Sequence, residues 1–409
     1  MRLRPKLFSF CGNKDRKAVT IQRVCAKRIT AKRVRDVSRF SRRLFVGDFE
    51  YQVRPLSLGQ LDGNRFNIVL RKIEKKRKND FEAISESIKE NGFINYFGLQ
   101  RFGSCSVPTH NFGKLVLKRQ WDELVALILF TDEIGKLPTQ HRKIAETLKN
   151  KKSFSEALKH CPKHLSVERP VLERLSQNIN SRDAFNSIAR QTKSIYVHAF
   201  QSYIWNKAAS ARLKKYGFSP VVGDLVVLGK EQGMAQSSGR KTKTLVRSLG
   251  KADVDSGDFS IFDVVLPLPC AGCELPRNEA GEIYEAELKK EGISDQLVEK
   301  LRKDRSLIIY PNYRPLMMRC LNFKSKFGSG LENSLPVEQP ELIENGSFSE
   351  MVNEQLVDRT LGEEQSSKTV DCEKKSGIII DREKFCAAQL QFDLPSSCYA
   401  TSLLREFSK

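Results

Sequence analysis

The sequence predicts a layered fold of the α/β or α+β class, because segments with strand periodicity alternate with segments of helical periodicity. Residues 65–73 place apolar side chains at every second position, which is typical of a half-buried strand. Residues 79–91 then carry an apolar stripe at helical spacing and end at an Asn-Gly pair, a frequent helix terminus. The chain has 409 residues, 40% of them hydrophobic, which indicates two or three domains with real cores.

The N-terminal section is strongly basic but is patterned like folded protein. Val19 and Ile21, then Val24 and Ala26, alternate through residues 18–28 as in a strand. Arg-rich, acid-poor beginnings also mark mitochondrial transit peptides, but those form Ser-rich amphipathic helices. We therefore expect a folded segment, in a protein of the nucleus or cytoplasm rather than of the mitochondrion. Ten scattered cysteines agree with a reducing compartment.

The middle of the chain predicts helices first and strands afterwards. Residues 123–130 and 141–158 lack strand alternation, and an aromatic stripe recurs at helical spacing through 194–213. We interpret this stripe as helix core rather than as a platform for stacking bases. Strands follow at 225–228 and 262–266, and then a helix near 294–303.

The last section combines a polar stretch with a return to order. Residues 323–376 are rich in Ser, Asn, Glu and Gln and show no sustained periodicity, so we expect a disordered, acidic insertion there. Strand patterns resume at 377–381 and 389–394, and a short helix is expected at 402–407.

The charge of the chain points to a polyanionic partner. The sequence contains 70 Lys and Arg against 49 Asp and Glu, a net charge of +21, and residues 1–43 alone carry +13. Residues 331–376 carry −7, so the rest of the chain reaches +28. A field of this size attracts nucleic acid. Apolar runs such as 264–268 are far shorter than the ~20 residues of a membrane span, so we expect no membrane association.

Residues 12–22 form the first candidate functional motif. Asp15 stands among Lys14, Arg16 and Lys17, directly before the expected strand. Flanking cations keep a carboxylate ionised, which suits a nucleophile or base that acts beside an anionic substrate. The alternative is a Gly-Asn-Lys-Asp turn in which Asp15 only caps the backbone, and residue types alone favour this alternative.

Residues 95–103 form the second candidate motif. Three aromatic residues, an Asn, a Gln and an Arg lie in nine positions that end with a glycine. Such a loop can stack a base on an aromatic face, read its Watson–Crick edge with a carboxamide and hold phosphate with the arginine. A packed aromatic turn explains the same composition equally well.

A metal or nucleotide cofactor is not expected. Cys270 and Cys273 form a single Cys-x-x-Cys pair without two further ligands at matched spacing. The sequence also lacks a Gly-x-x-x-x-Gly-Lys-[Ser/Thr] phosphate loop and a dinucleotide-binding Gly-x-Gly-x-x-Gly element.

The two motifs and the C-terminus together resemble the TruD-like pseudouridine synthases. The family's Gly-x-Lys-Asp and Ala-x-Thr-x-Gln elements are matched within 12–22, and its Asn-Tyr-Phe-Gly-x-Gln-Arg-Phe-Gly element is matched in full at 95–103. Its closing Leu-Pro-x-x-x-Tyr-Ala-Thr-x-x-Leu-Arg-Glu element is matched at 394–406. Residues 196–206 and 263–269 are similar to the inserted domain of eukaryotic members. The resemblance covers nearly the whole chain.

This resemblance implies an α+β fold, with a mixed β-sheet flanked by helices and an inserted α/β domain. The catalytic domain would comprise residues 1–120 and 305–409, and the inserted domain residues 121–304. The resemblance further implies isomerisation of uridine to pseudouridine within mRNA or tRNA. The enzyme would be a monomer that needs no metal, no cofactor and no protein partner.

The resemblance also implies roles for single residues. Asp15 falls on the family's catalytic aspartate, Phe97 falls on the aromatic that stacks on the target uracil, and Asn95 lies beside it in the pocket. A carboxylate that faces an anomeric carbon can attack it or remove the neighbouring sugar proton, and the sequence leaves both roles open. The other substrate-binding positions are expected to be Lys14, Gln22, Arg101 and Arg405.

Asp15 lies closer to Met1 than the resemblance leads one to expect. We therefore expect a chain that is shortened at its N-terminus relative to the family. The alternative function is that of an RNA-binding member of the family that has lost turnover.

Overall fold

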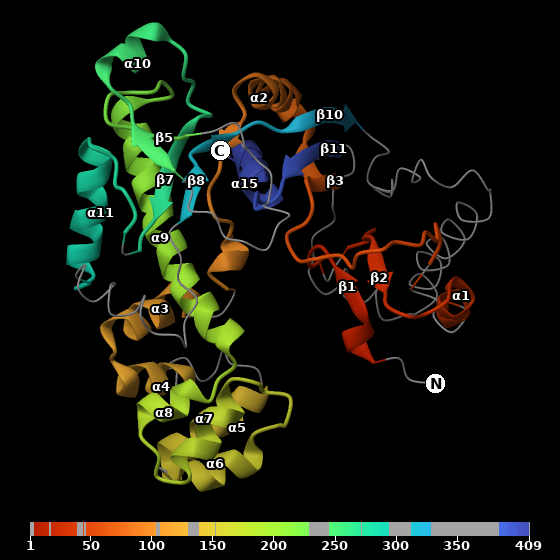
Figure 1. The fold of residues 1–409 in the computed structure, drawn as a ribbon, viewed down its shortest axis with the longest axis vertical. Coiled ribbons are helices and arrows are strands. Elements are labelled where there is room, and N and C mark those ends of the chain that lie inside the picture. The colour runs from red at the N-terminus through yellow and green to blue at the C-terminus, as the bar shows by residue number, and fades with distance from the viewer. Residues whose placement is uncertain are drawn as a thin grey trace. The chain divides into compact units, whose positions relative to one another are not determined.

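The computed structural model describes residues 4–15, 18–38, 44, 46–103, 107–129, 139–151, 153–228, 245–270, 272–293, 312–328 and 384–408. These residues form two compact units, whose elements are labelled in Figure 1. The first unit contains the described residues up to 90 and those from 320 to 397. The second contains the described residues from 91 to 319 and from 398 onward.

The first unit is built on a three-stranded antiparallel sheet in the order β10, β11, β3. β3 (Gly63–Glu74) and β11 (Phe385–Pro395) pair along most of their length, and β10 (Leu321–Gly328) pairs with the other edge of β11. The predicted strands at 65–73 and 389–394 are therefore confirmed.

Apolar side chains of β11 form the centre of this sheet. The register places Phe66 opposite Phe392, and the two rings stack with centroids 5.6 Å apart. Phe392 and Leu390 are completely buried, since β11 has a neighbouring strand on each side. Burying an aromatic or leucine side chain contributes about 1.5–3 kcal/mol each, so these residues account for much of the sheet's stability.

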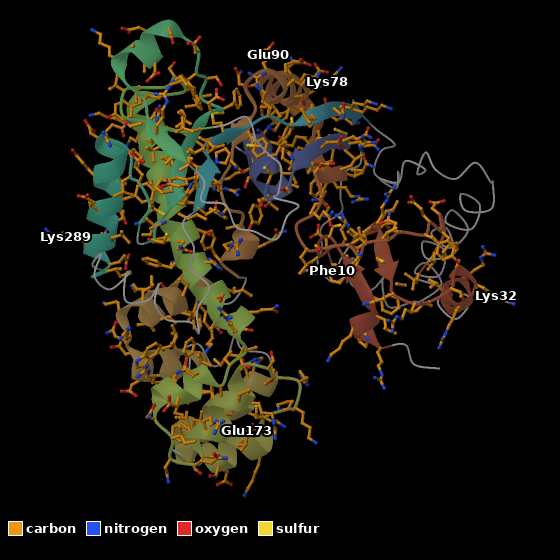
Figure 2. The ribbon with its side chains drawn as sticks, viewed as in Figure 1. Phe10, Lys32, Lys78, Glu90, Glu173 and Lys289 are labelled. Atoms are coloured by element: carbon orange, nitrogen blue, oxygen red, sulfur yellow. The ribbon has the colours of Figure 1, made fainter. Side chains whose placement is uncertain are left out.

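The helix predicted at 79–91 is confirmed as α2 (Lys78–Asn91), which presents its apolar stripe to the sheet. Phe81 packs with its ring centroid 5.3 Å from that of Phe327 on β10, and Ile88 is buried. The charged residues of the helix remain exposed, and Figure 2 labels two of them, Lys78 and Glu90.

The strand predicted over 18–28 is wrong for most of its length. Only Val24–Ala26 forms a strand, β2, which pairs with β1 (Phe8–Phe10). β1 has only three residues, so the ladder cannot extend further, and Val19 and Ile21 are 66% and 63% exposed. The helix α1 (Ala31–Ser38) follows.

The disordered insertion predicted at 323–376 is wrong at its beginning, because residues 323–328 belong to β10. β10 is the edge strand of its sheet, and it alternates exposed lysines with half-buried residues. Lysines on an edge strand hinder pairing with other chains, and they give the sequence a polar, loop-like composition. The remainder of that prediction, and the segments predicted at 294–303 and 377–381, lie outside the described residues.

Helices dominate the second unit. The predicted helix at 141–158 is in fact two helices, because the Ser153 hydroxyl accepts a hydrogen bond from the Glu156 amide and begins a new helix. The helices are α3 (Thr109–Lys118), α4 (Trp121–Leu129), α5 (Thr139–Lys151), α6 (Phe154–His160), α7 (Glu168–Leu175), α8 (Ser181–Asn186), α9 (Arg190–Tyr216), α10 (Lys251–Ser256), α11 (Glu279–Lys290) and α15 (Ala400–Leu404).

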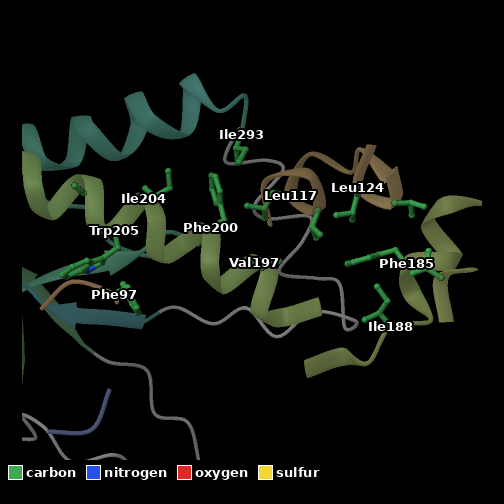
Figure 3. Close-up of a cluster of buried hydrophobic side chains, with 14 of the residues drawn as sticks. Phe97, Leu117, Leu124, Phe185, Ile188, Val197, Phe200, Ile204, Trp205 and Ile293 are labelled. Atoms are coloured by element: carbon green, nitrogen blue, oxygen red, sulfur yellow. The ribbon is translucent and has the colours of Figure 1, made fainter. Parts of the chain in front are cut away.

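α9 runs through the core of the second unit, as the aromatic stripe predicts. Its side chains Phe200, Ile204 and Trp205 are buried, and those of Ile204 and Trp205 point in different directions (Figure 3). The Trp205 indole donates a hydrogen bond to the carbonyl oxygen of Leu266 at 3.2 Å, which ties the helix to a strand. The stripe is therefore helix core and not a stacking platform.

The strands of the second unit form two further antiparallel sheets. The larger has the order β6 (Val246–Ser248), β5 (Leu225–Val227), β7 (Val264–Leu268) and β8 (Asn312–Pro315), and the smaller pairs β4 (Phe93–Ile94) with β9 (Met317–Met318). The predicted strands at 225–228 and 262–266 correspond to β5 and β7. The helix predicted at 402–407 begins earlier, as α15, and continues as a 3₁₀ turn over Arg405–Ser408.

Helices and separate sheets of this kind confirm the α+β class. Where the resemblance implied one mixed sheet, every strand pairing among the described residues is antiparallel. Within this part of the chain, no helix has the length and hydropathy needed to cross a membrane.

Candidate functional site

The motif at 95–103 directly follows the short strand β4 and forms a tight loop. β4 pairs with β9, and the Asn95 amide continues that contact by donating to the carbonyl oxygen of Leu316 at 3.0 Å. A single 3₁₀ turn over Leu99–Arg101 closes the loop. Because both ends are hydrogen-bonded, the loop between them is held in one conformation.

Asn95 is buried and is held by an arginine distant in the sequence. The Arg314 Nε donates to the Asn95 carbonyl oxygen at 2.8 Å, and its Nη2 donates to Asn95 Oδ1 at 2.6 Å. Asn95 Nδ2 donates to the Pro315 carbonyl oxygen at 3.1 Å. These contacts fix which way the carboxamide points, since both its oxygen and its nitrogen have partners.

The Phe97 ring lies next to Asn95 in an aromatic and cationic cage. Trp205 meets it edge-on with centroids 5.6 Å apart, as Figure 3 shows, and Tyr399 lies 6.1 Å away. The Arg314 guanidinium lies 4.1 Å from the ring centroid and that of Arg101 lies 5.6 Å from it. The ring is only 7% exposed.

The backbone of Phe97 is fixed by one side chain of α9. Asn206 Oδ1 accepts a hydrogen bond from the Phe97 amide at 2.9 Å, and Asn206 Nδ2 donates to the Phe97 carbonyl oxygen at 3.1 Å. A carboxamide paired with both backbone groups of one residue mimics a β-ladder, so it clamps the loop onto the helix.

The closing motif packs directly on this loop. A Cβ atom on Gly98 would lie 2.6 Å from Thr401 Oγ1 and 2.9 Å from Tyr399 Cδ1, so only glycine fits there. The Ser402 hydroxyl donates to the Tyr96 carbonyl oxygen at 2.8 Å, and the Arg405 guanidinium lies 5.7 Å from the Tyr96 ring. Two motifs about 300 residues apart in sequence therefore form one site.

Positive charge is concentrated beneath the Phe97 ring. Burial, together with the nearby charge of Arg101, lowers the pKa of the Arg314 guanidinium to about 10. Burial raises the pKa of the Cys398 thiol to about 11, so this cysteine stays protonated beside Arg314. The site can therefore hold a planar ring against an aromatic face while cations attract phosphate.

The remaining predicted residues belong to the first unit. Lys14 Nζ donates to Asn64 Oδ1 at 2.6 Å, which anchors the turn that follows β1. The side chains of Asp15 and Gln22 are exposed. Asp15 thus follows a strand and presents its carboxylate to solvent.

Comparison with known proteins identifies the family. The family model for tRNA pseudouridine synthase D (TruD) matches residues 1–337. The chain belongs to the TruD family. Multisubstrate pseudouridine synthase 7 of Schizosaccharomyces pombe is 34% identical over 98% of this chain and 57% of its own length. The human pseudouridylate synthase 7 homolog is 32% identical over 100% of this chain and 55% of its own length.

The TruD fold is confirmed by a solved structure. The crystal structure of a TruD-type protein from Methanosarcina mazei has a TM-score of 0.66 to this chain at 23% identity, and the match covers 98% of this chain and 81% of that protein. The chain spans about half the length of the curated relatives it matches.

Three residues of the site were missed in the sequence analysis. The loop at 95–103 is held by Arg314, Asn206 and Tyr399. Arg314 is 219 positions from Asn95 in the sequence. Tyr399 is the tyrosine of the closing motif at 394–406, and the sequence predicted no role for it. Asn206 is the last residue of segment 196–206, which is similar to the inserted domain of the family. Its place in that segment was the only feature of the sequence that could have identified it as a site residue.

No group of three or more His, Cys, Asp or Glu side chains in the described part of the chain could hold a metal ion.

Proposed function

We propose that the protein is an RNA pseudouridine synthase, which converts uridine to pseudouridine within mRNA or tRNA. The loop at 95–97 carries this proposal, because a buried Asn and Phe fixed by Arg314 and Asn206 form a rigid seat for one flipped base. Membership of the TruD family and a net charge of +21 support an RNA substrate.

We assign the bond-breaking step to Asp15. The reaction breaks the bond between N1 of uracil and C1′ of ribose and forms a bond from C5 to C1′, while C5 loses a proton and N1 gains one. An exposed carboxylate can attack C1′ or remove the neighbouring sugar proton, and either route starts the isomerisation. The reaction conserves all its atoms, so no group from outside the uridine is consumed.

The freed uracil is held against Phe97 while it turns. Because this ring is 7% exposed, a base stacks on it only after a neighbouring side chain moves aside. Arg101 is the side chain to move, because its Nε has no hydrogen-bond partner among the described residues. Asn95 then meets the edge of the base, and we expect Lys14, Gln22 and Arg405 to contact the RNA.

The remaining assignments are coarser. We propose that residues 1–120 and 305–409 form the catalytic domain and that residues 121–304 form an inserted domain. The protein acts as a monomer in the nucleus or cytoplasm and needs no cofactor.

Quantifying pseudouridine in RNA incubated with the protein tests this function. We expect conversion by the parent protein and none by Asp15→Asn. Asp80→Asn is the matched control, because Asp80 is also exposed and lies on α2. RNA that binds to the parent protein with salt-dependent affinity yet keeps every uridine would refute the activity of this chain.

The stacking role of Phe97 needs a milder substitution than alanine. Phe97→Ala would leave a cavity in the core and lower stability by about 3–5 kcal/mol, so we choose Phe97→Leu. We expect this variant to lose most pseudouridine formation, since stacking is worth about 1–3 kcal/mol per base. We expect it to bind RNA almost as tightly as the parent, because phosphate contacts supply most of the affinity. Parent-like turnover in Phe97→Leu would show that the base stacks elsewhere.

A further inference from the structure

Two cysteines lie against each other at the end of β7. The Sγ atoms of Cys270 and Cys273 are 3.0 Å apart, within hydrogen-bonding distance for sulfur. A disulfide needs a separation of about 2.05 Å, so closing the bond requires about 1 Å of movement. Both side chains are partly exposed, so a small molecule can reach them.

The surroundings of the pair favour a thiolate at Cys273. The Cys270 thiol donates a hydrogen bond to Cys273 and, with backbone hydrogen bonds from Asn312 and Cys270, lowers the pKa of Cys273. In its protonated form Cys273 donates to the Leu268 carbonyl oxygen at 3.3 Å. A thiolate held by donors in this way is the reactive form of cysteine.

Other thiols of the described chain differ from this pair. Burial raises the pKa of Cys161, and it raises the pKa of Cys320 and of Cys398 to about 11. These thiols stay protonated near neutral pH and react slowly with disulfides. The lowered pKa of Cys273 therefore distinguishes it from these three buried thiols.

We propose that Cys270 and Cys273 form a reversible dithiol–disulfide site that is oxidised by small-molecule disulfides of the glutathione type. The Cys273 thiolate attacks one sulfur of the small disulfide, forms a mixed disulfide and releases one thiolate. Cys270 then loses its proton and attacks the Cys273 sulfur, which releases the second thiolate. Two cysteine thiols are oxidised and one small disulfide is reduced to two thiols, so atoms and electrons balance.

The site is joined to the strand that carries Arg314. Asn312, whose backbone contacts the Cys273 sulfur, is the first residue of β8, and Arg314 lies two positions later. The Tyr313 hydroxyl between them accepts a hydrogen bond from the Glu274 amide at 2.7 Å. Closing the disulfide therefore moves the loop that holds Cys273 and Glu274, which contact the first residues of β8.

Differential alkylation of the 409-residue chain tests the proposal. The protein is equilibrated with rising ratios of oxidised to reduced glutathione, free thiols are alkylated, and tryptic peptides are weighed. Trypsin releases residues 252–277 as one peptide that holds both cysteines and no others. We expect this peptide to lose two hydrogen atoms, about 2 Da, and to escape alkylation as the ratio rises.

Single substitutions establish the order of attack. Cys270→Ser should trap glutathione on Cys273 as a stable mixed disulfide, and Cys273→Ser should leave Cys270 largely alkylated. Cys25→Ser is the control, because Cys25 lies on β2, and it should match the parent. The proposal is overturned if the parent peptide carries two alkyl groups at every ratio, or if it retains glutathione on one cysteine while the other is alkylated.

Discussion

Substitution of Arg314 distinguishes the charge of its guanidinium from the geometry of its hydrogen bonds. The side chain is 6% exposed and donates from Nε and Nη2 to the two oxygens of Asn95. Methionine removes the charge and both donors while retaining the bulk of the chain. Lysine retains the charge but cannot donate to both oxygens in the planar geometry of a guanidinium.

The two variants should differ in stability in a definite order. Loss of the donors leaves two buried oxygens unpaired, at about 1–3 kcal/mol each. Burial lowers the pKa of Arg314 from 12.5 to about 10, so removing the charge recovers about 3 kcal/mol. Two unpaired oxygens cost about 2–6 kcal/mol together, so we expect Arg314→Met to change stability by between a gain of about 1 and a loss of about 3 kcal/mol. Arg314→Lys keeps a buried charge with poorer partners and should lose about 3–5 kcal/mol.

Denaturant unfolding followed by tryptophan fluorescence measures this order. The chain has two tryptophans, Trp121 and Trp205, and both belong to the second unit, where Arg314 lies. Arg277→Met is the control, because that side chain is 75% exposed and should change stability by less than about 0.5 kcal/mol. A lysine variant as stable as the methionine variant would refute the reasoning, because a buried charge with poorer partners would then carry no penalty.

Three further substitutions test other contacts by thermal or denaturant unfolding. Gly98→Ala should lower stability by about 1–3 kcal/mol, because its Cβ would lie 2.6 Å from a threonine hydroxyl, whereas Gly47→Ala meets no atom within 4 Å and should be neutral. Asp224→Asn breaks the completely buried ion pair between Asp224 and Arg212 of α9 and should cost about 3–5 kcal/mol; a loss below about 1 kcal/mol would contradict this. The Arg247 hydrogen bond lowers the pKa of Asp253 from 3.8 to about 2, so its contribution is complete above pH 4 and is lost as the pH falls toward 2. In Asp253→Asn, the stability should therefore fall less steeply as the pH drops from about 4 to 2. An identical dependence of stability on pH in the two proteins would exclude the effect.

Periodicity predicted the long elements well. α9 carries apolar residues at helical spacing over many turns, and its prediction needed no knowledge of its partners. β11 alternates in the same dependable way at Leu390, Phe392 and Leu394. The loop at 95–103 was found by its composition, but no pattern in the sequence predicted its packing on the closing motif.

Features that depend on distant partners could not be predicted. β10 carries lysines on its exposed face because it is an edge strand, and the sequence does not show which strand lies at an edge. Arg314 stands in an ordinary Tyr-Arg-Pro sequence, and only the pairing of β4 with β9 brings it to Asn95. Val19 and Ile21 alternate correctly, but β1 is too short to pair with them.

The pairing of β3 with β11 has a consequence for synthesis on the ribosome. About 310 residues separate Glu74 from Phe385, and at about 5–20 residues per second the second strand is made about 15–60 s after the first. During that interval β3 has no partner strand on the edge that β11 will occupy, and its apolar side chains are exposed to solvent. The nascent chain is therefore a substrate for chaperones that hold unpaired strands, and a ribosome stalled before residue 385 would release a protein whose first unit lacks the central strand of its sheet.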